Sequence, residues 1–159
     1  MDLTPDTIRH YVTHVFDGMG RVLDRLDDDT VNQQPENWGT NSVAGLVVHC
    51  CELAPSWFLL PGMGRASVRD RDSEFTTTAT IAELRQRIAD AVAQTNELVA
   101  EFEVGPTAGD HELRAFLPGG DQSDGSLVIH VFEELFQHLG HIEVTADALA
   151  ARLPRYEIL

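Results

Sequence analysis

Four long stretches of the sequence place apolar residues at intervals of three and four, which is the spacing of one face of an α-helix. The segments between them are rich in Gly, Pro, Asp and Ser, and no stretch shows a convincing strand pattern. The helices are predicted to run from about Thr4 to Leu26, Thr40 to Leu60, Thr80 to Phe102 and Ser126 to Arg152. This order predicts an all-α fold, a single-domain four-helix bundle over residues 1–159 with a long crossover connection between the second and third helices.

Residues that cap or break helices mark the expected ends of the second helix. A capping cluster of Thr40, Asn41 and Ser42 precedes it, and Pro61 followed by Gly62 is expected to stop it. Pro55 lies inside this helix and predicts a kink or an earlier end, because proline removes a backbone donor.

The two longest connections are polar. Residues 61–78 are arginine-rich without periodicity and are predicted to form a surface connection. The loop before the fourth helix is about twenty residues long, with a short extended piece expected at Glu112–Phe116. Loops of that length are often functional or disordered.

The charge of the chain excludes several classes of function. It has 26 acidic and 11 basic residues, a formal net charge of −15 and no lysine, so a nucleic-acid partner is not expected. No apolar run approaches the ~18 residues that a membrane span needs. The acidic start, with Asp2 and Asp6, lacks the layout of a secretory signal, so a cytoplasmic location is expected. Cys50 and Cys51 are adjacent, a spacing that fits neither a normal disulfide nor a CxxC motif.

Polar residues on the apolar faces of the helices are the candidates for chemistry. On a helical wheel, Glu134 and His138 fall within the core-facing side of the fourth helix, one turn apart, whereas His130 and His141 fall just outside it. His49 stands in the middle of the second helix, which is apolar nearly all round. Two ligands from one helix and a third from a facing helix would leave an open position on a metal ion, as catalytic sites do.

Two simpler explanations remain open for these residues. A lone histidine on an apolar helix is more often a hydrogen-bonded core residue than a ligand, and a Glu-x-x-x-His pair is usually a surface ion pair. Cys50 and Cys51 are expected to be small buried core residues, although their place beside His49 also makes them secondary candidates for a thiol role.

Two motifs give the chain a family resemblance. Asn41–His49 is a polar cap, an apolar run and a histidine that follow a loop containing Trp38, and it resembles the second-helix signature of the DinB-like superfamily. Glu134–His141 resembles the fourth-helix motif of that superfamily, in which most members have His-x-x-x-His. The Glu at the first position is the variant seen in the metal-binding domain of mycothiol-dependent maleylpyruvate isomerase.

The resemblance implies a metal site and a thiol. The three metal ligands of the family fall on His49, Glu134 and His138, and His141 falls outside them. Family members bind a divalent ion, commonly zinc or nickel, and several are transferases or isomerases that use mycothiol, bacillithiol or glutathione. The isomerase carries a further C-terminal domain, whereas this chain ends at Leu159, so maleylpyruvate isomerisation itself is not expected.

The function expected from these observations is transfer of a low-molecular-weight thiol, mycothiol or a similar one, to a small electrophile. His141 or His130 would take the thiol proton, and Arg65, Arg69 and Arg71 would hold a carboxylate on the thiol or substrate. The sequence leaves two alternatives open: hydrolysis by a metal-bound water, and a non-catalytic metal- or ligand-binding module that pairs as a homodimer.

Overall fold

The computed structural model describes residues 3–36, 40–63, 69–100, 117, 119 and 123–150, with residues 59–63 described by their backbone alone. All regular elements in these ranges are helical, so the all-α prediction is confirmed. They are α1 (Pro5–Leu23), the short 3-10 helix η1 (Thr30–Asn32), α2 (Val43–Met63), α3 (Arg71–Thr76), α4 (Ile81–Ala100) and α6 (Asp124–Ala150).

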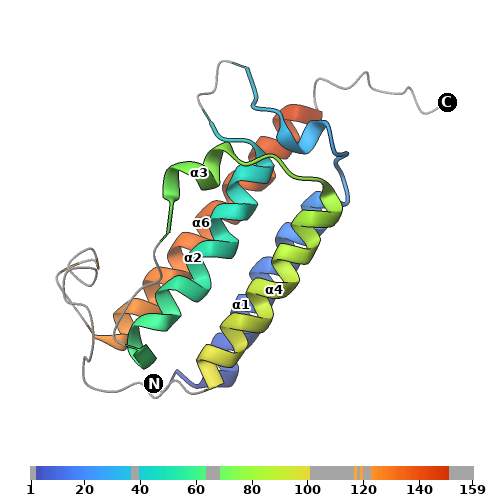
Figure 1. Ribbon diagram of the computed structural model, residues 1–159. Helices are drawn as coiled ribbons and strands as arrows, with labels where there is room; N and C mark the ends of the chain where they lie inside the picture. Colours follow the sequence, from blue (N-terminus) through green and yellow to red (C-terminus); the bar gives the residue numbers. More distant parts are fainter. Residues whose placement is uncertain are drawn as a thin grey trace.

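The four long helices form a bundle in which α1 and α2 each pack against both α4 and α6. Helices α1 and α2 are therefore diagonal to each other. Figure 1 shows that α1 and α6 run in one direction, whereas α2 and α4 run in the other. Because α2 and α4 are parallel neighbours, the chain must return along the length of the bundle between them, as the predicted crossover requires.

The crossover contains a helix that the sequence pattern did not predict. Helix α3 lies within the segment expected to be an irregular surface connection, and it packs against α2. Asp70 caps its start, since the Asp70 carboxylate accepts a hydrogen bond from the backbone N–H of Ser73 at 3.2 Å. A helix of six residues is too short for an apolar repeat to reveal it.

The ends of α2 differ from those expected. Ser42, one of the three predicted capping residues, accepts a hydrogen bond from the N–H of Gly45 at 3.1 Å, and the helix begins directly after it. At the other end, the helix continues through Pro55 and past Pro61 to Met63, so the predicted stop at Pro61 is wrong. Packing of α2 against α4 and α6 offsets the backbone hydrogen bond that Pro55 removes.

The other helices deviate by a few residues. Helix α1 ends at Leu23 rather than Leu26, because the chain turns there and the Asp27 carboxylate accepts the Thr30 N–H at 2.7 Å, which starts η1. Helix α6 begins at Asp124 rather than Ser126, and the Ser123 hydroxyl accepts a hydrogen bond from the Ser126 N–H at 3.1 Å. The predicted extended piece at 112–116 and the expected ends at Phe102 and Arg152 lie outside the described residues.

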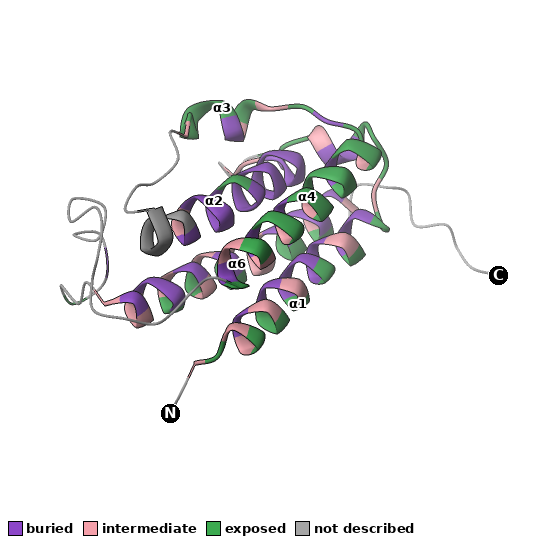
Figure 2. Cartoon of the chain, turned by 60° about the horizontal axis from the view of Figure 1, so that its bottom comes forward, coloured by how far each residue is buried: buried purple, intermediate pink, exposed green. Residues whose placement is uncertain are grey.

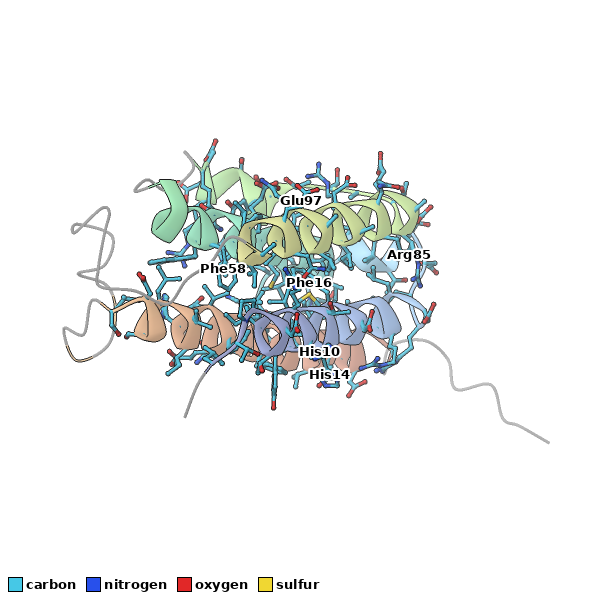
Figure 3. The ribbon with its side chains drawn as sticks, turned by 90° about the horizontal axis from the view of Figure 1, so that it is seen from below. His10, His14, Phe16, Phe58, Arg85 and Glu97 are labelled. Carbon is cyan, nitrogen blue, oxygen red and sulfur yellow. The ribbon has the colours of Figure 1, made fainter. Side chains whose placement is uncertain are left out.

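The core lies between the long helices. Figure 2 shows that α2 is buried over most of its described length, while α1, α4 and α6 each bury a stripe. Phe16 points into the bundle, whereas His10 and His14 lie on its outer side (Figure 3). None of the described helices is long and apolar enough to cross a membrane.

Candidate metal centre

The structure brings His49 of α2 together with Glu134 and His138 of α6. One nitrogen or carboxylate oxygen from each side chain lies within 4.8 Å of the other two, and this is the group of potential metal ligands that the described residues form. His49 is 1% exposed, and Glu134 and His138 are half-buried. The three residues come together because α2 and α6 are packed neighbours and because positions 134 and 138 lie on successive turns of one helix.

The separation between Glu134 and His138 suits two ligands of one ion better than a direct hydrogen bond. His138 Nε2 and Glu134 Oε2 are 3.5 Å apart, which is long for a hydrogen bond. Two ligands at ~2.1 Å from a tetrahedral zinc ion would lie about 3.4 Å apart. The Nε2 atom of His49 is buried and has no hydrogen-bond partner in the described part of the chain. A buried imidazole nitrogen without a partner is costly unless something binds it, so the donor set fits a divalent cation.

A buried carboxylate that sequence reasoning missed supports His49 from the other side of its ring. Glu74 of α3 is 4% exposed, and its Oε2 lies 2.8 Å from His49 Nδ1. Arg69 binds the same carboxylate with two parallel hydrogen bonds, Nε to Oε1 at 2.9 Å and Nη2 to Oε2 at 2.6 Å. No sequence signal identified Glu74, because it lies in the segment without periodicity.

Burial sets the protonation state of both histidines. It lowers the pKa of His49 below its usual 6.5, and the hydrogen bond to Glu74 opposes this only in part. Burial likewise lowers the pKa of His138, against the attraction of the Glu134 carboxylate. Both imidazoles are therefore neutral at pH 7, which is the form that binds a metal.

A cavity of about 330 Å³ opens beside these residues. Its wall combines two of the candidate ligands with an apolar side and a cationic side: His49, Glu134, Leu53, Trp57, Arg69, Arg71 and His130. A larger groove of about 720 Å³ runs between α1 and α4, but none of the described residues that line it is a histidine or cysteine. The cavity of about 330 Å³ therefore has the side chains needed to hold a ligand beside the candidate metal site.

The predicted proton acceptors and substrate-binding arginines lie in different surroundings. His130 lines the cavity and contacts Trp57, with ring centroids 5.0 Å apart. The His141 ring stacks on the His138 ring, with ring centroids 6.3 Å apart. The Nε2 atom of His141 is hydrogen-bonded to the Thr40 hydroxyl. Arg69 lines the cavity, but two of its guanidinium nitrogens already donate hydrogen bonds to Glu74. Arg65 lies outside the described residues.

The two cysteines are buried core residues, as expected. Cys50 is 0% exposed, Cys51 is 6% exposed, and neither forms a disulfide. Burial raises the pKa of Cys51 to about 12 and raises that of Cys50 as well. Neither thiol therefore supplies a thiolate at neutral pH.

Comparison with known protein families shows which family the chain belongs to. The family model described as mycothiol-S-transferase matches residues 7–150. The chain belongs to the mycothiol-S-transferase family. This is a DinB-like family, so the resemblance drawn from the two helix motifs is confirmed. Membership supports a mycothiol S-transferase type of function with a small thiol as partner. Comparisons with curated proteins and with solved structures give no match.

Proposed function

We propose that this member of the mycothiol-S-transferase family transfers mycothiol to a small electrophile at a divalent metal site formed by His49, Glu134 and His138, with zinc or nickel as the ion. The observation that supports this most strongly is the convergence of one potential ligand atom from each of the three residues within 4.8 Å, together with a buried His49 Nε2 that has no hydrogen-bond partner among the described residues. The cavity beside them supplies the space for a thiol and its acceptor.

The proposed site has a charge suited to a thiolate. A divalent ion bound there would lower the pKa of a coordinated thiol, so that the nucleophilic thiolate forms near neutral pH. Two neutral imidazoles and the Glu134 carboxylate leave such a site with a net charge of about +1. The Arg69–Glu74 pair behind His49 is neutral as a unit and leaves this balance unchanged.

The remaining roles are proposed for side chains at or near the candidate metal site, of which His130, Arg69 and Arg71 line the cavity. His130 or His141 accepts the thiol proton, and the sulfur then forms a bond to the electrophilic carbon while the leaving group departs with the bonding electrons. Leu53 and Trp57 form an apolar wall for the electrophile. Arg65, Arg69 and Arg71 are proposed to bind a carboxylate on the substrate, and of these Arg71 is exposed at the cavity wall.

A transfer assay tests this proposal. The zinc-supplemented protein is mixed with mycothiol and monochlorobimane, and the fluorescent adduct is quantified, with bacillithiol as the alternative thiol. The proposal predicts adduct formation with mycothiol that stops after chelation and is absent in His49→Ala. No adduct above the metal-free control would contradict it.

A further inference from the structure

We infer that α3 is the element that fixes His49 for metal binding: Glu74 sets the tautomer of the ring, Arg69 holds Glu74, and Phe75 holds the ring plane. This inference deepens the proposed function and rests on it. It assigns a positioning role to residues that contact the ligand His49 but do not belong to the group of three candidate ligands.

The tautomer follows from the groups around His49 Nδ1. At 2.8 Å from an ionised carboxylate oxygen, Nδ1 must carry the proton and donate it, since two unprotonated acceptors would repel each other at that distance. A neutral imidazole has one proton, so the lone pair then lies on Nε2, the buried nitrogen that has no hydrogen-bond partner among the described residues. Outer carboxylates of this kind commonly orient metal-binding histidines.

The effect of Arg69 on the ring proton of His49 depends on whether Glu74 is present. Its Nη2 lies 3.3 Å from His49 Nδ1, close enough to donate to that nitrogen if Glu74 were absent. Such a bond would move the ring proton to Nε2 and block the lone pair that a metal needs. With Glu74 in place, the two charge-assisted bonds of the Arg69 fork hold the carboxylate beside His49 Nδ1.

The plane of the ring is fixed by the next residue of α3. Phe75 stacks on His49 with ring centroids 4.6 Å apart and an interplanar angle of 24°. The stack requires α3 to approach the backbone of α2 closely at Gly45. A Cβ added to Gly45 would lie 2.9 Å from the carbonyl oxygen of Phe75 and 3.2 Å from its Cα. Because these are backbone atoms, they could move away only if α3 moved with them.

The test combines a readout without metal and one with it. The protonated nitrogen of His49 is identified in the metal-free protein by long-range ¹H–¹⁵N correlation, and zinc affinity is measured by competition with a chromophoric chelator. The variants are Glu74→Gln, which keeps the side-chain size, and Gly45→Ala. Their matched controls are Glu97→Gln on the exposed face of α4 and Gly20→Ala, whose nearest neighbour would be an Arg85 nitrogen at 4.0 Å.

We expect wild type to carry the proton on Nδ1. Glu74→Gln should shift it toward Nε2 and weaken zinc binding about 10- to 100-fold, the usual effect of losing an outer partner. Gly45→Ala should weaken zinc binding in the same direction, and neither control should do so. Wild type protonated on Nε2, or a folded Glu74→Gln protein with unchanged tautomer and zinc affinity, would overturn the inference. If wild type binds no zinc but shows the expected tautomers, the proposed function fails while the positioning of His49 stands.

Discussion

His138 Nε2 and Glu134 Oε2 lie 3.5 Å apart on successive turns of α6, a separation that suits two ligands of one ion better than a hydrogen bond. Removing the negative charge while keeping the shape, in Glu134→Gln, should weaken zinc binding by at least about tenfold. Glu134→His should restore binding, because an imidazole there also offers a lone pair. Chelator competition measures both. Equal zinc affinity in wild type and Glu134→Gln would show that this carboxylate is not a ligand.

The two candidate proton acceptors should differ in their effect on transfer. His130 lines the cavity, and its buried Nδ1 has no hydrogen-bond partner among the residues described, whereas His141 is bonded to Thr40 through Nε2. We therefore expect His130→Gln to lower the rate of adduct formation on the order of 10²-fold with unchanged metal content, and His141→Gln to lower it less. The reverse order would assign the proton transfer to His141.

The cysteines should be unreactive in the folded protein. With its pKa raised to about 12 by burial, Cys51 is ionised to only about one part in 10⁴ at pH 8, and the pKa of buried Cys50 is raised as well. Ellman's reagent should therefore react slowly with the native protein and rapidly with two thiols in urea. Rapid reaction of either cysteine in the folded protein would indicate an accessible thiolate and would support a role for a protein thiol in the reaction.

The sequence was sufficient to predict the three residues that the structure brings together as potential ligands, but not the Glu74 carboxylate that contacts His49. Helical periodicity placed Glu134 and His138 on one buried face, and an apolar run singled out His49, because both signals are local to one helix. Glu74 belongs to a short helix in the crossover and Arg69 precedes that helix, and only the path of the chain brings them to His49. The same limit applies to α2, which continues past Pro61 to Met63 although the local sequence predicts a stop there.

Stability of the metal-free protein should fall on mild acidification. Burial places the folded-state pKa of His49 and His138 below the 6.5 of the unfolded chain, so the unfolded state binds protons first as the pH falls. The contribution of these residues to stability is complete above about pH 7 and is lost as the pH falls through 6.5 toward the folded-state values. Urea midpoints across this range measure it.

A matched pair of variants isolates that effect. His138→Gln should flatten the decline below about pH 7, because one of the two imidazoles no longer titrates. His10→Gln, which removes an exposed histidine of α1, should leave the decline as in wild type. A wild-type midpoint that stays constant or rises on acidification would contradict the neutral, buried state of these imidazoles.

Metal content is the most direct test of the central claim, that His49, Glu134 and His138 hold a divalent ion. The protein is equilibrated with zinc or nickel, dialysed, and analysed for bound metal per chain, alongside His49→Ala, His138→Ala and the control His10→Ala on the outer side of the bundle (Figure 3). We predict one ion per chain in wild type and in His10→Ala, and none in the other two variants. Wild-type protein without a stoichiometric ion, or equal loss in all three variants, would contradict the claim.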